Sequence, residues 1–148
     1  MNEPLIFDIA LGRTKPVNMR DASVRCPFCD RSKLIDILAQ DGHIIWLMNK
    51  YPVLKDTWPT VIIETEGDQG ELSTLSLDEA TRIIQFGMDK WHETISTKEF
   101  ESVLFFKNHG PMSGGSIRHP HSQIIGLRNY DYHEDITVKN MNGWLLHE

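Results

Sequence analysis

A single long amphipathic helix set between apolar strands most constrains what this chain can fold into. Ser76 is a good N-cap residue, and Glu79 follows three positions later, as in a capping box. The apolar residues that come next recur at helical spacing and share one predicted face: Leu77, Ala80, Ile83, Ile84, Met88, Trp91 and Ile95. We therefore predict one long helix whose apolar face covers a sheet.

Four short apolar runs predict the strands of that sheet. They lie at residues 44–48, 60–64, 102–107 and 122–127, two before the helix and two after it. This order lacks the strand–helix alternation of a doubly wound parallel fold, so the predicted fold class is α+β with an antiparallel sheet. A second, weaker helix is expected around Ser32 to Gln40.

Length and composition limit the possible classes of protein. The 148 residues suffice for one domain with a hydrophobic core, and we expect an extended arm over residues 1–25. No apolar run approaches the roughly 18 residues that a membrane helix needs, and the first residues lack the pattern of a secretory signal. We therefore expect a cytoplasmic protein with no membrane partner. The formal charge of -6 argues against nucleic acid as a partner.

The two cysteines of the chain, Cys26 and Cys29, form a Cys-Pro-x-Cys motif. Where no export signal is seen, such a pair is more often a metal clip or a redox pair than a structural disulfide.

The segment richest in chemistry spans residues 107–123, which run from an apolar strand through a glycine-rich loop into another strand. Gly114 and Gly115 would let backbone N–H groups approach an anion closely, and Asn108 and Ser116 add side-chain donors. The loop is therefore a candidate phosphate cradle, although a simple turn would use the same residues.

Three polar side chains follow this loop at alternating positions. In an extended chain His119, His121 and Gln123 point to one side, and they would make a poor core. A neutral imidazole can attack phosphorus when one ring nitrogen carries the lone pair and an acceptor holds the other. The amide of Gln123 could donate to a phosphoryl oxygen.

Taken together, these motifs resemble the histidine-triad (HIT-like) superfamily, and within it the galactose-1-phosphate uridylyltransferase branch. The signature His-Pro-His-x-Gln stands at residues 119–123, after Asn108 and Ser116 at the spacing of that branch. Cys-Pro-x-Cys lies upstream, as does a strand that ends at Asn49 shortly before an aromatic residue. The similarity covers roughly residues 13–128, with the motifs in the family's order.

The resemblance implies a nucleotidyltransferase. Such an enzyme forms a covalent nucleotidyl-histidine from a nucleoside diphosphate sugar and passes the nucleotidyl group to a phosphorylated acceptor. His121 would be the nucleophile and Gln123 the donor to the phosphoryl oxygen, and a glutamine at this last motif position is associated with transferases. The substrate-binding residues implied by the resemblance are Asn49, Asn108, Gly114, Gly115 and Ser116.

Zinc is the cofactor that the resemblance implies. Cys26, Cys29 and His119 would be ligands. The fourth ligand is a histidine in the family, and counting without gaps puts Asp68 at its place; an aspartate oxygen can also ligate zinc. His43 is a possible substitute that no spacing argument supports.

Members of this branch usually carry two histidine-triad repeats, of which this sequence shows the first. We therefore expect either a chain cut after residue 148 or a tight homodimer, and the turn signal Asn142-Gly143 fits a strand begun and not completed. Two alternatives stay open: a nucleotide phosphorylase or hydrolase of the same superfamily, and a non-catalytic nucleotide-binding module. A thiol redox protein is weaker, because the thioredoxin-like βαβ context is missing around the cysteines.

Overall fold

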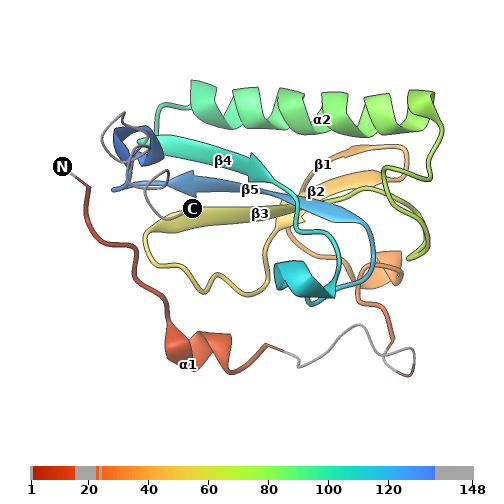
Figure 1. Ribbon diagram of the computed structural model, residues 1–148, viewed down its shortest axis with the longest axis horizontal. Helices are drawn as coiled ribbons and strands as arrows, with labels where there is room; N and C mark the ends of the chain where they lie inside the picture. Colours follow the sequence, from red (N-terminus) through yellow and green to blue (C-terminus); the bar gives the residue numbers. More distant parts are fainter. Residues whose placement is uncertain (1, 16–22, 24, 136–148) are drawn as a thin grey trace, which may run out of the picture.

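A five-stranded antiparallel sheet with one long helix across it forms the centre of the computed structural model, which describes residues 2–15, 23 and 25–135 (Figure 1). The sheet has the order β1-β2-β3-β5-β4, and every neighbouring pair is antiparallel. The strands are β1 (Ile37–Asp41), β2 (Ile44–Met48), β3 (Thr57–Ile63), β4 (Ser102–Phe106) and β5 (His121–Leu127), and the helix is α2 (Leu77–Ser96). The predicted α+β class with an antiparallel sheet is confirmed.

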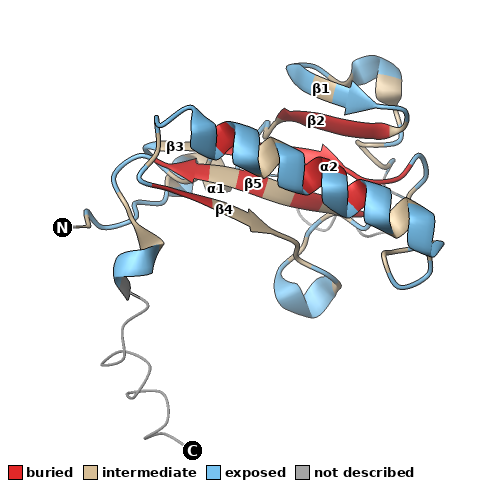
Figure 2. Cartoon of the chain, turned by 90° about the horizontal axis from the view of Figure 1, so that it is seen from above, coloured by how far each residue is buried: buried red, intermediate tan, exposed pale blue. Residues whose placement is uncertain are grey.

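Helix α2 begins where the sequence predicts, but its buried face is rotated from the predicted one and shares Ile83 with it. The Ser76 hydroxyl accepts a hydrogen bond from the backbone N–H of Glu79 at 3.2 Å. Figure 2 shows α2 lying across the sheet, with a few buried residues among mostly exposed ones, and the buried residues are Ile83, Phe86, Gly87 and Thr94. Four residues of the predicted face are exposed instead: Leu77, Ile84, Met88 and Ile95. The face is rotated because α2 meets the ring of Phe105 on β4 at Gly87, where there is no side chain to hold the two apart.

Two apolar clusters lie on the two faces of the sheet, because successive strand residues point to opposite sides. One cluster joins the sheet to α2 and consists of Ile44, Trp46, Ile62, Ile83, Phe86, Val103 and Ile124. The other holds Ile45, Leu47, Val61 and Ile63, covered in part by Phe28 and Leu34. On β5, Ile124 therefore faces the helix, whereas His121 and Gln123 face away from it.

The helix predicted around Ser32 to Gln40 is wrong. Residues Arg31–Lys33 form a single 3-10 turn, and Ile37–Asp41 form the edge strand β1. Asp36 has a φ of 55° and Gly42 a φ of 61°, neither of which a helix accommodates. Gly42 instead closes a tight hairpin to β2. The strand escaped sequence analysis because β1 is largely exposed and lacks a clear alternation, so three strands precede the helix rather than two.

The described part of the N-terminal arm contains structure that was not predicted. Phe7 forms an isolated antiparallel bridge with Leu54, and Ile9–Gly12 form the short helix α1. The rest of the arm, residues 16–22 and 24, lies outside the described residues, as does the predicted turn at Asn142-Gly143. Within the residues described, no helix has both the length and the apolar character needed to cross a membrane.

Candidate functional site

The histidine motif lies where the chain enters β5, at one end of the sheet. Pro120 has no N–H to give to a ladder, and the strand begins at the next residue. The Pro120 carbonyl accepts a hydrogen bond from the backbone N–H of Glu64 at 3.1 Å, which ties this entry to the end of β3. His119 precedes the strand, and its side chain turns toward the two cysteines.

His119 and the two cysteines form a compact cluster of metal-ligand atoms. Nδ1 of His119 lies 3.3 Å from the sulfur of Cys26 and 3.4 Å from the sulfur of Cys29. The imidazole is 1% exposed, and the three ligand atoms all lie within 4.8 Å of one another. Nε2 of His119 donates to the carbonyl of Thr65 at 2.7 Å, so the lone pair of Nδ1 faces the sulfurs. Metal-binding histidines are commonly oriented in this way by a backbone carbonyl.

The electrostatics of the cluster suit a soft divalent cation. Burial lowers the pKa of His119 below its usual value, the Arg31 charge adds to this, and the hydrogen bond to the Thr65 carbonyl opposes it in part. Burial and the neighbouring Cys26 raise the pKa of Cys29 to about 11, so this thiol keeps its proton until a cation replaces it. Two sulfurs and one imidazole nitrogen are a donor set that zinc prefers, and the residues present fit that ion.

Arg31 holds the backbone around this cluster. One guanidinium nitrogen donates to the Thr65 carbonyl at 2.6 Å, and another donates to the His43 carbonyl at 2.7 Å. The Thr65 carbonyl thus accepts from both Arg31 and His119, which fixes the His119 ring against the end of β3.

Asp68 lies beside the cluster, but its carboxylate is not part of it. The backbone N–H of Asp68 hydrogen-bonds to Cys29, and its carboxylate accepts from the Gln69 amide at 3.0 Å. The alternative ligand His43 points elsewhere, since its Nε2 lies 3.5 Å from the Glu79 carboxylate on α2. The fourth metal ligand therefore stays a prediction.

His121 is oriented by its own neighbour in the motif. Its Nδ1 lies 2.7 Å from the carbonyl oxygen of His119, which can only accept, so Nδ1 carries a proton and, in the neutral ring, Nε2 carries the lone pair. The ring of Phe28 meets both histidines edge-on, with centroid distances of 5.5 Å to His121 and 5.9 Å to His119. The motif thus holds the tautomer that nucleophilic attack through Nε2 requires.

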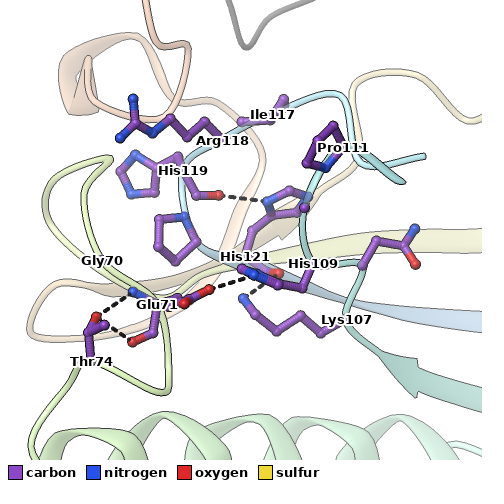
Figure 3. Close-up of a pocket in the computed structure, with 13 residues that line it drawn as sticks. Gly70, Glu71, Thr74, Lys107, His109, Pro111, Ile117, Arg118, His119 and His121 are labelled. Atoms are coloured by element: carbon purple, nitrogen blue, oxygen red, sulfur yellow. Dashed lines mark hydrogen bonds and ion pairs between the residues drawn. The ribbon is translucent and has the colours of Figure 1, made fainter. Parts of the chain in front are cut away.

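A cavity of about 350 Å³ lies beside this histidine (Figure 3). Two loops form its walls, residues 70–74 after β3 and residues 107–111 after β4, together with the motif segment 117–121. Two polar contacts connect the loops: His109 Nε2 lies 2.6 Å from a Glu71 carboxylate oxygen, and Arg118 donates to the Gln69 side chain at 2.8 Å. The lining beside His121 thus includes the basic side chains of Lys107, His109 and Arg118, together with the carboxylate of Glu71.

The structure brings only some of the predicted substrate-binding residues to this cavity. Asn108 lines it together with His121, whereas Gly114, Gly115 and Ser116 do not. Gly114 ends a 3-10 turn with a φ of 79°, a conformation that favours glycine. Asn49 follows β2 away from the cavity, and its side chain accepts from the backbone N–H of Tyr51 at 2.8 Å.

Gln123 shares a face with His121 but lies deeper in the sheet. It is the third residue of β5 and is paired with Val61 on one side and Phe106 on the other. The amide therefore lies on the sheet face that His121 uses, two positions further along the strand.

Sequence reasoning missed the charged pair behind the motif. The carboxylate of Glu64 is 2% exposed, and the ammonium of Lys107 lies 2.7 Å from it. Each residue directly follows an apolar strand next to β5, which is a signal that could have suggested a pairing. The role of Thr65 had no such signal, because it acts through its backbone carbonyl.

The sequence model of one protein family, described as the N-terminal domain of DUF4931, a domain of unknown function, matches residues 7–130. A solved DUF4931 family protein from Bacillus cereus is 44% identical, with a TM-score of 0.67; the match covers 71% of this chain and 48% of that one. The chain thus spans about half the length of this relative. No curated protein matches the sequence.

More distant solved structures share the fold. A structure named uridylyltransferase is 21% identical, with a TM-score of 0.64, and the match covers 99% of this chain and 52% of that one. A HIT family protein from Bacillus anthracis is 16% identical, with a TM-score of 0.58, and the match covers 82% of this chain and 93% of that one. The fold is therefore HIT-like, in agreement with the resemblance drawn from the motifs. The family match over residues 7–130 shows that the chain belongs to the DUF4931 N-terminal domain family.

Proposed function

We propose that this chain carries a nucleotidyltransferase site in which His121 is the nucleophile. The observation that carries the proposal is the 2.7 Å hydrogen bond from His121 Nδ1 to the His119 carbonyl, beside a cavity that His121 lines. It leaves the lone pair on Nε2, which would attack the α-phosphorus of a nucleoside diphosphate sugar. A nitrogen–phosphorus bond forms, and the bond from that phosphorus to the bridging oxygen breaks. The leaving group departs as a sugar phosphate.

The Nδ1 proton stays in place through this step. Nucleotidylation of Nε2 makes the ring cationic, and the His119 carbonyl stabilises that charge through the Nδ1–H bond. Gln123 would donate its amide N–H to a phosphoryl oxygen. In the second half of the cycle, an oxygen of a phosphorylated acceptor attacks the same phosphorus, and the neutral imidazole leaves.

The remaining predicted contacts belong to this proposal. Asn108 would hold phosphate or the leaving group from the cavity wall. Ser116 would share that role, Gly114 and Gly115 would offer backbone N–H groups to the phosphate, and Asn49 would lie near the ribose or base. A second histidine-triad repeat or a second copy of the chain would complete the substrate site, since the solved relatives are about twice as long as the matched region.

Zinc would be held by Cys26, Cys29 and His119, with Asp68 as the fourth ligand after its carboxylate turns from Gln69. The ion would supply a rigid cross-link between the cysteine segment and the motif. It would thereby fix His119, whose carbonyl orients the nucleophile.

A covalent-labelling experiment tests the proposal. The protein is incubated with nucleoside diphosphate sugars that carry ³²P at the α-position, and protein-bound label is counted. Wild type and His92→Ala should be labelled, because His92 is exposed on α2, whereas His121→Ala should not. Equal labelling of His121→Ala and wild type would contradict the assignment of the nucleophile.

The fate of the label separates the related activities. Release by a sugar phosphate indicates a transferase, release by inorganic phosphate a phosphorylase, and release by water alone a hydrolase. Absence of label, together with a nucleotide-dependent rise in the unfolding temperature, would instead indicate a binding module.

A further inference from the structure

The Glu64–Lys107 ion pair lies directly behind the histidine motif, and the proposed transfer reaction makes no use of it. Lys107 Nζ is 2.7 Å from a carboxylate oxygen of Glu64. It is also 3.1 Å from the carbonyl oxygen of His121, next to which Lys107 is drawn in Figure 3. Lys107 follows β4 and Glu64 follows β3, the two strands on either side of β5. The pair therefore bridges the sheet at the residue that opens β5.

Burial makes this pair a poor device for stability alone. The Glu64 side chain is 2% exposed and that of Lys107 is 20% exposed, so both charges lose most of their hydration. Replacing a buried ion pair by apolar residues of similar volume is often neutral or stabilising. The role of the pair is therefore better judged from the hydrogen bonds that its two residues make with the backbone of the motif.

These contacts fall on the motif itself. The backbone N–H of Glu64 donates to the Pro120 carbonyl at 3.1 Å, and Lys107 Nζ donates to the His121 carbonyl. The His119 carbonyl, in turn, accepts from the His121 ring at 2.7 Å. Three successive carbonyls, at residues 119, 120 and 121, thus each have a donor. The donor to His121 is the ammonium of the ion pair, whereas the donor to Pro120 is a backbone N–H that does not depend on the pair.

We propose that Lys107, held in place by Glu64, is a positioning residue that fixes the backbone of His121 and so aims its imidazole. The role rests on the proposed function of His121 as nucleophile. A displacement of about 1 Å at a reacting atom can slow a reaction by about 100-fold, even when ligand binding is retained. Loss of Lys107 should therefore slow attack without weakening nucleotide affinity.

The test compares Glu64→Gln/Lys107→Met with wild type in single-turnover labelling from the α-³²P nucleoside diphosphate sugar. The double variant leaves no unpaired buried charge. We expect its labelling rate to fall about 100-fold, with the nucleotide dissociation constant within about two-fold of wild type. Lys107→Arg keeps a cationic donor and should restore most of the rate.

Lys90→Met is the matched control. Lys90 is 21% exposed and forms a 2.7 Å ion pair with Glu93, but it lies on α2, across the sheet from the motif. It should label at the wild-type rate. If the double variant does not fold, Glu64→Gln alone removes the counter-charge that holds Lys107 and should still slow labelling about ten-fold.

Two results would overturn the inference: an unchanged labelling rate in the Lys107 variants, or a loss that lies entirely in nucleotide affinity, which would make Lys107 a ligand contact. A second readout does not depend on activity. The ¹⁵N shifts of the His121 ring, assigned with His121→Ala, should report the Nδ1–H tautomer in wild type and a mixture in the double variant. Absence of label in wild type would refute the proposed function. An unchanged His121 tautomer in the double variant would refute the positioning role, whatever the labelling shows.

Discussion

Gly87 sets how closely α2 approaches β4, and its replacement by alanine should destabilise the protein. At an open helix position alanine is favoured over glycine by about 1 kcal/mol. At this position, however, the new Cβ would lie 2.3 Å from Cζ of Phe105 and 2.9 Å from its Cε1. Overpacking of this kind costs about 1–3 kcal/mol, and so short an approach belongs at the upper end. We therefore expect Gly87→Ala to lower the free energy of unfolding by about 1–2 kcal/mol.

Urea denaturation measures this difference, and the background of Phe105→Leu provides a stringent test. Leucine does not reach as far as the phenylalanine ring, so Gly87→Ala in that background should raise the free energy of unfolding by about 1 kcal/mol. Gly67→Ala, where no atom lies within 4 Å of the new Cβ, should change stability by less than about 0.5 kcal/mol. An unchanged or higher stability of Gly87→Ala in the wild-type background, or the same sign in both backgrounds, would refute the reasoning.

Two further predictions concern the core and the metal cluster. Thr60→Val should lower the free energy of unfolding, measured by urea denaturation, by about 1–3 kcal/mol. The reason is that the buried Thr60 hydroxyl accepts a hydrogen bond from Trp46 Nε1 at 2.7 Å and donates one to the Ile124 carbonyl at 2.8 Å. Thr60→Ser keeps that hydroxyl, and a greater loss in Thr60→Ser than in Thr60→Val would contradict the argument. Zinc affinity should strengthen by about ten-fold or more per pH unit between about pH 6 and 8, since the pKa of Cys29 is about 11 and zinc must displace its proton. Competition with a chelating dye measures this slope, and a flat profile would count against Cys29 as a ligand.

Local patterns were enough to predict the class of the fold and the chemistry of its motif. The capping box at Ser76 and the apolar runs act over a few residues, so the start of α2 and four of the five strands follow from sequence. Alternation along a strand placed His121 and Gln123 on one face for the same reason. The exposed strand β1 was missed, because its residues carry no burial pattern to read.

Tertiary structure decided everything that depends on contacts between distant segments. The cysteines and His119 are about 90 residues apart in the chain, and only folding shows that Asp68 does not share their cluster. The buried face of α2 depends on where Phe105 meets it, which no helical periodicity contains.

The chemistry of His121, the proposed nucleophile, divides in the same way. The sequence determined that an imidazole follows a glycine-rich loop, since residue identity alone supplies that group. The position of the His119 carbonyl decides which ring nitrogen of His121 carries the proton. The His121 carbonyl accepts a hydrogen bond from Lys107, and Lys107 forms an ion pair with Glu64. A hydrogen bond needs a particular distance and direction between its partners, and only the folded backbone fixes these for atoms on three different strands.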